Sequence, residues 1–130
     1  MNVKSAMEDA ELPFHLAYDK DGNFIGAAVE TFTNKGFSGN ISLMVGILAD
    51  GTVNNISVLQ HAETPGLGSK MSEPSFKDQF NNKHADSFNF NVKKDGGDVD
   101  AITAATISSR AFCDAVNRAI STFENNKGGF

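Results

Sequence analysis

Apolar and polar residues alternate through the first half of the chain, in short runs separated by turn-forming residues. The alternation predicts four strands, at residues 14–18, 24–33, 41–49 and 52–60. A period of two is typical of strands that bury one face of a sheet. The pair Asp50-Gly51 stands between two of these runs, which is a strong hairpin signal. We therefore expect the first half to fold as an antiparallel meander.

A long segment without periodicity follows the last of these strands. The stretch HAETPGLGSKMSEP, residues 61–74, contains two prolines and two glycines and is expected to be a loop. Loops longer than about 12 residues are uncommon in compact domains unless they are functional or disordered. The overlapping stretch SEPSFKDQF predicts a short helix, which Ser72 would cap and Pro74 would begin. Its two phenylalanines, Phe76 and Phe80, would share one face.

The last part of the chain has the apolar spacing of a helix. The helical pattern runs from about Ile107 to Phe123, and its apolar residues from Ala111 to Phe123 form a single stripe. The stretch SFNFNV, residues 87–92, alternates as a further strand. Together these patterns predict an α+β fold, in which an antiparallel twisted sheet (a meander) carries a long C-terminal helix and a short helix packed on it. No repeat or internal boundary is visible, so we expect residues 1–130 to form a single domain.

Composition and charge narrow the possible functions. Hydrophobic residues make up 40% of the chain and charged residues 21%, which is typical of a globular domain. The formal net charge of -5 means that the chain lacks the excess of basic residues typical of nucleic-acid binders, so we expect no nucleic-acid partner. The single cysteine, Cys113, excludes an intrachain disulfide and a cysteine metal cluster, and is expected to be a buried apolar residue. No apolar run approaches the ~20 residues that span a bilayer.

Several weaker signals favour ordinary structural roles. Asp19, Asp21 and Asn23 resemble the start of a calcium-binding loop. Phe24 stands where such a loop requires glycine, so a plain hairpin turn is expected. The glycines of GLGS lack the longer pattern of dinucleotide-binding loops. No spacing typical of metal ligands joins the three histidines, His15, His61 and His84.

The stretch HAETPGLG, residues 61–68, combines polar side chains with an unusual backbone. His61, Glu63 and Thr64 place a switchable donor, an acceptor and a hydroxyl close together. Pro65 restrains the residue before it, and the two glycines that follow permit positive φ angles and the close approach of another group. On these residues alone, a solvated connector is a slightly better interpretation than a binding loop.

The stretch DAITAATISSR, residues 100–110, crowds four hydroxyl side chains around the expected start of the last helix. The simpler interpretation is a helix N-terminus with redundant caps, from Thr106, Ser108 or Ser109. The alternative is an anion site, because free N–H groups and the helix dipole stabilise a nearby negative charge by ~0.3–1 kcal/mol. A phosphate on Thr106 would fit there, since the two preceding alanines leave room beside it. From the residues alone, capping is the better interpretation.

Together these two stretches resemble the FMN-binding domain of the G subunit of the Rnf electron-transport complex, and of its relative, the C subunit of the sodium-translocating NADH:quinone reductase. Residues 35–68 are similar to the G-type form in particular. The resemblance implies an electron-carrier subunit of a membrane-bound, ion-translocating oxidoreductase complex. A flavin would carry the chemistry, so the chain needs no catalytic acid or base of its own. The domain would lie on the extracytoplasmic, periplasmic face of the bacterial inner membrane.

The resemblance also implies a covalent cofactor. In that family FMN is joined through its phosphate to the last threonine of an Asp-x-x-(Ser/Thr)-Gly-Ala-Thr motif, and DAITAAT places Thr106 there. Asp100 matches the aspartate of the motif, which a flavin transferase recognises when it makes the bond. The other cofactor-binding residues that the resemblance implies are Thr103, Ala104, Ala105 and Ser108 beside the motif, and His61, Glu63, Thr64, Pro65, Gly66, Leu67 and Gly68 in the loop.

Two features depart from the family pattern. Ala104 stands where the family usually has glycine, and an added methyl group in a tight loop alters the backbone or weakens recognition by the transferase. Family members also begin with a transmembrane helix. We expect that this anchor was removed from the chain, and that it holds the domain at the membrane beside the other subunits of the complex.

Two other functions stay open. A non-redox module of the same fold would bind a ligand or partner and leave Thr106 unmodified. A flavin domain of a larger soluble reductase would be flavinylated, but it would adjoin a catalytic domain. The G-like stretch at residues 35–68 argues against this second alternative.

Overall fold

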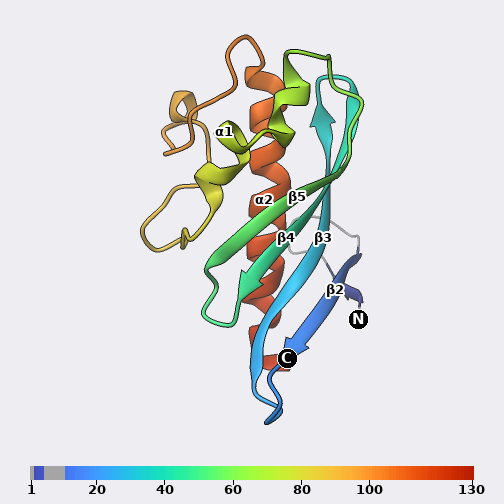
Figure 1. The fold of residues 1–130 in the computed structure, drawn as a ribbon, viewed down its shortest axis with the longest axis vertical. Helices are drawn as coiled ribbons and strands as arrows, with labels where there is room; N and C mark the ends of the chain where they lie inside the picture. The colour runs from blue at the N-terminus through green and yellow to red at the C-terminus, as the bar shows by residue number, and fades with distance from the viewer. Residues whose placement is uncertain (1, 5–10) are drawn as a thin grey trace.

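A five-stranded antiparallel sheet forms the first half of the protein in the computed structural model, which describes residues 2–4 and 11–130. The strands are β1 (Asn2–Lys4), β2 (Glu11–Tyr18), β3 (Phe24–Gly36), β4 (Gly39–Leu48) and β5 (Val53–Gln60). Each strand pairs with the next one in sequence, as Figure 1 shows for the ribbon. This confirms the predicted meander, although β2 and β3 are longer than expected and β1 was not expected.

Tight turns join the strands where the sequence predicts them. The Asp19 carboxylate accepts hydrogen bonds from the N–H groups of Asp21 and Asn23, each at 2.9 Å, and so closes the turn between β2 and β3. The stretch that resembles a calcium loop is therefore a hairpin turn. Between β4 and β5, the N–H group of Gly51 donates to the Leu48 carbonyl at 2.8 Å. Gly51 has a φ of 95°, a conformation that favours glycine.

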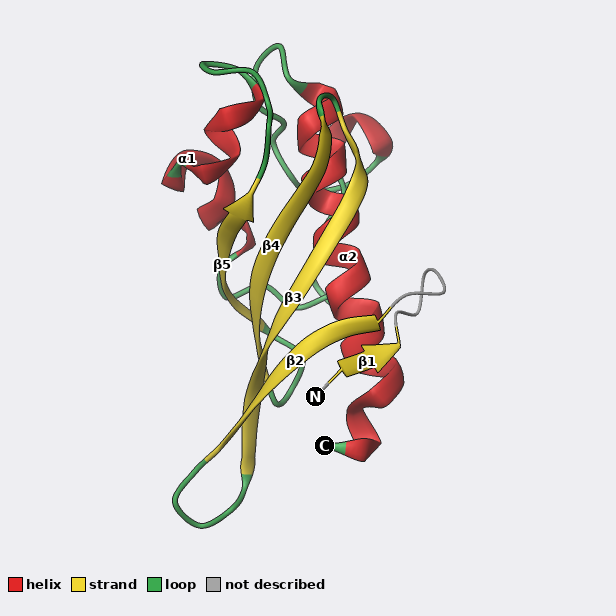
Figure 2. Ribbon diagram, turned by 90° about the vertical axis from the view of Figure 1, so that its right-hand side faces the viewer, coloured by secondary structure: helices red, strands yellow, loops and turns green. Residues whose placement is uncertain are grey.

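A single long helix, α2 (Thr106–Asn126), covers one face of the sheet, so the domain has two layers (Figure 2). From the middle of the sheet, the Thr31 hydroxyl donates to the Ala115 carbonyl of α2 at 2.9 Å. The apolar stripe of the helix is buried against the strands, and each large side chain in it contributes about 1.5–3 kcal/mol. Its buried members include Ala111, Phe112, Ala115, Val116, Ala119, Ile120 and Phe123. The predicted α+β fold is confirmed.

Short helical segments connect β5 to α2. They are η1 (Gly68–Ser72), α1 (Pro74–Lys77), η2 (Asp78–Phe80) and η3 (Lys93–Asp95), and a last turn, η4 (Lys127–Gly129), follows α2. Pro74 begins α1, as predicted. The expected cap at Ser72 is wrong, because Glu73 occupies the N-cap position and no side chain caps the helix. The predicted short helix is thus one α-helical turn between two tighter 3-10 turns.

A cluster of phenylalanines attaches these segments to α2. Phe76 and Phe80 each lie with their ring centroids 5.0 Å from that of Phe112. Phe90 stacks on Phe80 at 6.1 Å. The expected strand at residues 87–92 is wrong, because within the described part of the chain this segment pairs with no strand and makes only an isolated bridge near its end. The segment is irregular, and its alternating pattern arises because two of its apolar side chains, Phe90 and Val92, lie in the core.

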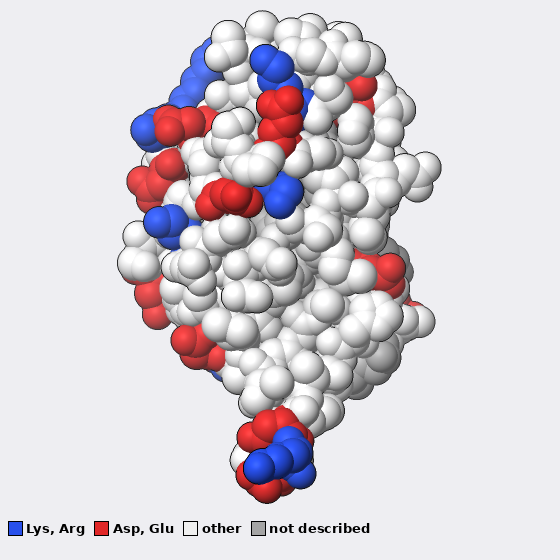
Figure 3. Space-filling model, viewed as in Figure 1, with Lys and Arg blue, Asp and Glu red and all other residues white. Residues whose placement is uncertain are grey.

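The face of the sheet that α2 does not cover points outward. In β4, buried Ile41, Leu43 and Val45 alternate with half-buried residues, as expected when only one face meets the core. Figure 3 shows that charged side chains gather along one side of the molecule and at the tip of the β2–β3 hairpin, and leave the middle of this view largely uncharged.

Three further expectations concern the cysteine, a metal site and a membrane-spanning helix. Cys113 is only 2% exposed, and burial raises the pKa of its thiol to about 12, so it behaves as an apolar core residue. The described residues hold no group of three or more His, Cys, Asp or Glu side chains arranged to bind a metal ion. None of the helices in the described ranges is long and apolar enough to cross a membrane.

Candidate functional site

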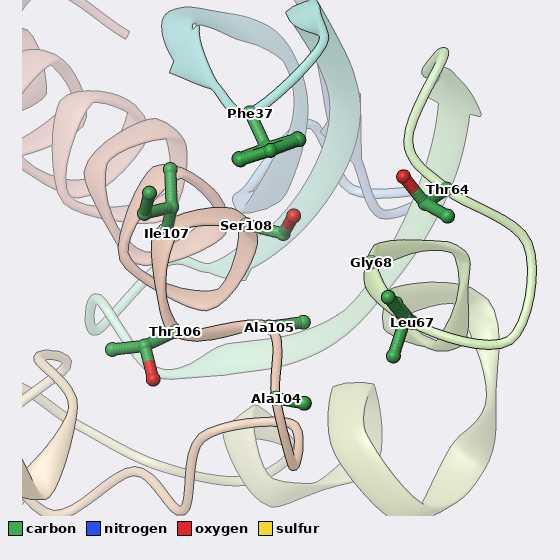
Figure 4. Close-up of a pocket in the computed structure, with 9 residues that line it drawn as sticks. All are labelled: Phe37, Thr64, Leu67, Gly68, Ala104, Ala105, Thr106, Ile107 and Ser108. Atoms are coloured by element: carbon green, nitrogen blue, oxygen red, sulfur yellow. The ribbon is translucent and has the colours of Figure 1, made fainter.

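Three segments far apart in sequence meet beside the first turn of α2, at the upper end of the molecule in Figure 1. They are the β3–β4 turn, the loop after β5, and the segment that leads into α2. They enclose a cavity of about 350 Å3, within the range of ~300–1,000 Å3 typical of small-molecule sites. We refer to it as the α2 groove. Its walls, drawn in Figure 4, are Phe37, Thr64, Leu67, Gly68, Ala104, Ala105, Thr106, Ile107 and Ser108.

The walls of the α2 groove are mostly apolar, and none of the described residues that line it is charged. Phe37 is 68% exposed, and Leu67 and Ile107 are 40% and 49% exposed. Figure 4 shows Phe37 reaching from the β3–β4 turn across the side where Ile107 and Ser108 lie. Exposed apolar side chains gathered around a cavity are typical of a ligand-binding groove. The groove therefore suits a ligand with a large apolar part.

The start of α2 lacks a side-chain cap. Ala105 occupies the N-cap position, so the expected caps are wrong. The Ser109 hydroxyl donates to the Ala105 carbonyl and accepts from the Ile102 N–H group, both at 2.9 Å. The Ser108 hydroxyl donates elsewhere. Within residues 2–4 and 11–130, no acceptor pairs with the first three N–H groups of the helix. These donors, at the positive end of a 21-residue helix, form a site suited to an anion.

Ala104 has an unusual backbone conformation just before the helix. Its φ is 62°, in the left-handed region that residues other than glycine rarely adopt. This conformation turns the chain so that Ala104 and Ala105 both face the groove, on the side of Leu67 (Figure 4). A positive φ gives a physical reason why glycine suits this position. An alanine there carries a strain of about 1–2 kcal/mol.

Glu63 lies behind the groove wall and holds it together. Its side chain is 4% exposed and accepts hydrogen bonds from the Phe37 N–H group at 2.8 Å and the Ser38 N–H group at 2.9 Å. It also accepts from the Ser108 hydroxyl at 2.6 Å. Burial alone would raise the pKa of this carboxyl, but the three hydrogen bonds lower it by more. The pKa therefore lies below its ordinary value. Glu63 is therefore a charged anchor between the β3–β4 turn and α2.

The remaining loop residues fall into two groups. Thr64, Leu67 and Gly68 line the groove. Gly68 is required there, because a Cβ atom would lie 2.7 Å from the Cβ of Glu63 and would also meet the Ser108 hydroxyl. Four other residues of the loop are not part of the lining, namely His61, Glu63, Pro65 and Gly66. The His61 ring accepts from the Glu63 N–H group at 3.0 Å and so shapes the loop.

The motif region also divides between the groove and its surroundings. Thr106 is the first residue of α2 and lies at the edge of the groove, with its side chain turned away from Leu67 in Figure 4. Thr103 is exposed and does not line the cavity. The Asp100 carboxylate lies 2.7 Å from the Lys93 ammonium group and is 71% exposed. The Gln79 side chain pairs with the backbone of Asp100 through two hydrogen bonds, at 2.8 and 2.9 Å.

Two lining residues are absent from the sequence-based predictions. Phe37 and Ile107 both contribute large apolar surface to the groove. The signal that could have identified Phe37 is its place in the turn KGFSG, where an aromatic side chain has no core to join. Ile107 is one residue past the motif threonine, at the expected start of the helix, and no role in the groove was predicted for it. Its 49% exposure shows that it faces outward instead.

The fold and the groove together define a class of protein: a small α+β domain with a mostly apolar groove that ends at an uncapped helix N-terminus. The family model of the FMN-binding domain matches residues 36–121, which include the β3–β4 turn, the loop and the start of α2. The chain belongs to this family.

Curated relatives extend the similarity over most of the chain. It is 40% identical, over 124 residues, to the G subunit of the ion-translocating oxidoreductase complex of Shewanella baltica, covering 92% of this chain and 58% of that protein. It is 42% identical to the G subunit of this complex in Aliivibrio fischeri strain ES114, covering 84% and 54%. The corresponding G subunit of Methanosarcina acetivorans is 39% identical, covering 95% and 66%. The chain thus spans little more than half the length of the first two relatives.

Solved structures share the fold at lower sequence identity. The C subunit of the Na(+)-translocating NADH-quinone reductase from Parabacteroides distasonis aligns with a TM-score of 0.65 at 22% identity, covering 89% of this chain and 61% of that one. The NqrC protein of Shewanella oneidensis aligns with a TM-score of 0.61 at 18% identity, covering 98% and 70%. The arrangement of a meander sheet and a long C-terminal helix is therefore shared with these proteins.

Proposed function

We propose that this domain carries FMN in the α2 groove and passes electrons within an ion-translocating oxidoreductase complex of the Rnf type. The observation that supports this most directly is the uncapped start of α2, which offers three N–H donors beside Thr106 at one end of an apolar groove. Membership of the FMN-binding domain family and the names of the curated relatives support the same conclusion.

The groove fits the two chemically different parts of FMN. The apolar lining suits the flat isoalloxazine ring, and Phe37 offers an aromatic face of the kind that stacks on such rings. The free N–H groups at the start of α2 suit the phosphate. When bound, FMN supplies the redox chemistry. The residues of the chain bind and orient the cofactor and keep water from part of its surface.

The covalent link to Thr106 is part of the proposal. This threonine is the first residue of α2 and lies at the groove edge. A phosphodiester at this position carries one negative charge, which the helix dipole and the free N–H groups stabilise. A flavin transferase would form the bond from a flavin dinucleotide: the Thr106 oxygen would replace the nucleoside monophosphate on the flavin-side phosphorus, the pyrophosphate bond would break, and the hydroxyl proton would be lost. The enzyme would recognise Asp100, whose carboxylate is exposed to a partner.

The cellular setting follows from the same proposal. We propose that residues 1–130 together form this domain, which extends beyond residues 36–121, the span that the family model matches. It would act on the periplasmic face of the inner membrane, held by an N-terminal helix and in contact with other subunits of the complex. A covalent bond prevents loss of the cofactor at such a site. The net charge of -5 gives no reason to expect nucleic acid as a partner.

The test is the intact mass of the domain after co-expression with a flavin transferase. We expect the parent protein to gain the mass of one FMN group, and Thr106→Ala to gain none. The matched control is Ser75→Ala, which removes an exposed hydroxyl outside both motifs and should still gain FMN. A flavin retained by Thr106→Ala would place the attachment elsewhere, and a parent protein without flavin would favour the non-redox binding module.

A further inference from the structure

We propose that Glu63 is a positioning residue of the flavin site: its buried carboxylate, without touching the cofactor, fixes the turn that carries Phe37 and the Ser108 hydroxyl in the groove wall. This inference rests on the proposed function for its redox part. Its structural part concerns the protein alone and can be tested without flavin.

The contacts of Glu63 are those of an anchor. Of its two oxygens, Oε1 accepts from the Phe37 N–H group at 2.8 Å and from the Ser108 hydroxyl at 2.6 Å. The other oxygen, Oε2, accepts from the Ser38 N–H group at 2.9 Å. Only 4% of the residue is exposed, so these protein donors replace solvent around the charge. Hydrogen bonds to an ionised acceptor are stronger than those to a neutral one.

The turn that Glu63 anchors is largely exposed. Phe37 itself is 68% exposed, so burial of its own ring does not fix its position. The turn bends sharply, since Gly36 pairs with Gly39 across it, where the register of β3 and β4 shifts. The Glu63 carboxylate is therefore the contact that determines where the ring of Phe37 stands over the groove.

Glu63 influences the site through its charge as well as through its position. Ser108 lines the groove and donates to the carboxylate, so the negative charge lies one hydroxyl group behind the wall. A reduced flavin gains negative charge, which a fixed carboxylate nearby disfavours. Glu63 should therefore hold the midpoint potential of the bound flavin lower than a neutral residue would.

The structural part is tested by amide hydrogen exchange on the flavin-free protein, comparing the parent with Glu63→Gln. Glutamine has one acceptor oxygen, so an NH2 group must face either the Ser38 donor or the Phe37 and Ser108 donors. We expect exchange at Phe37 and Ser38 to accelerate by about tenfold or more. The matched control is Glu73→Gln, which removes an exposed carboxylate from the same connecting segment and should leave both amides unchanged. Unchanged exchange in Glu63→Gln would overturn the proposal.

The redox part is tested by potentiometry on the flavinylated proteins. We expect Glu63→Gln to keep its flavin mass and to show a higher midpoint potential and a changed flavin absorption spectrum. A second variant, Ser108→Ala, keeps the carboxylate but removes one of its donors, and should shift the potential downward. This opposite sign keeps the test decisive if Glu63→Gln does not fold. Equal potentials in all variants, or loss of flavin from a folded Glu63→Gln, would overturn the inference. A parent protein without flavin would overturn only the proposed function, and the exchange test would then decide the inference.

Discussion

The Ser108 hydroxyl donates a 2.6 Å hydrogen bond to the Glu63 carboxylate, and this bond joins the first turn of α2 to the loop after β5. The two residues are 45 positions apart, yet both are almost fully buried. Each belongs to one of the two motifs on which the family resemblance rests. The two motifs thus form two of the three walls of one groove, and the bond between them stabilises its shape.

The first prediction concerns acid stability. Burial raises the pKa of Glu63, but its hydrogen bonds lower it more, so the folded-state pKa lies below the unfolded value of about 4.3. The stabilisation is therefore present above about pH 4.3 and is lost as the pH falls through the folded-state pKa. We expect the free energy of unfolding of the parent to fall more steeply than that of Glu63→Gln below that pH. Urea unfolding at a series of pH values measures this, and parallel pH profiles would contradict it.

The second prediction concerns Ala104. Its φ of 62° strains an alanine but not a glycine. We expect Ala104→Gly to raise the free energy of unfolding by up to about 1 kcal/mol, because relief of strain outweighs the added freedom of the unfolded chain. The control is Ala119→Gly inside α2, which should lower it by about 1 kcal/mol or more. Urea unfolding of both variants decides the sign, and a destabilised Ala104→Gly would show that the methyl group makes a stabilising contact.

The third prediction separates recognition from stability at Asp100. Its carboxylate is 71% exposed and pairs with Lys93, and such pairs contribute little to stability, about 0–1 kcal/mol. We expect Asp100→Ala to reduce the yield of flavinylated protein strongly while its melting temperature changes little. Lys93→Ala removes the same ion pair but keeps the carboxylate, so it should be flavinylated normally. Mass spectrometry and thermal unfolding give both quantities. A large loss of melting temperature with normal flavin content would refute the prediction.

The fourth prediction compares two glycines of one loop. A Cβ atom at Gly68 would collide with Ser108 and lie 2.7 Å from the Cβ of Glu63, whereas one at Gly66 would meet nothing within 4 Å. Gly66 has a φ of 78°, so an alanine there is strained only in its backbone, by about 1–2 kcal/mol. Gly68→Ala adds overpacking, which costs about 1–3 kcal/mol, and separates the two buried partners. We expect Gly68→Ala to perturb the flavin spectrum and Gly66→Ala to leave it unchanged. The same spectral change in both variants would contradict this.

Local patterns in the sequence determined much of the fold. The strands of the meander and the long helix follow from alternation and from a 3.6-residue period, which express how each element buries one face. Turn residues such as Asp50-Gly51 mark where strands reverse, because their backbone preferences are local. The segment at residues 87–92 shows the limit. It alternates like a strand, but among the described residues it pairs with no strand of the sheet, so it stays irregular.

The two motifs alone also predicted a common location, and HAETPGLG and DAITAATISS both contribute walls to one groove. What only the tertiary structure decided is the part each residue takes. Glu63 is a buried anchor rather than a lining residue, and Phe37 reaches the groove from a turn 26 positions before Glu63. The Ser108 and Ser109 hydroxyls donate to Glu63 and to the Ala105 carbonyl, so neither caps the helix. These facts depend on contacts between distant parts of the chain. A hydrogen-bond partner 26 or 45 positions away leaves no periodic trace in a sequence, so only the folded chain shows it.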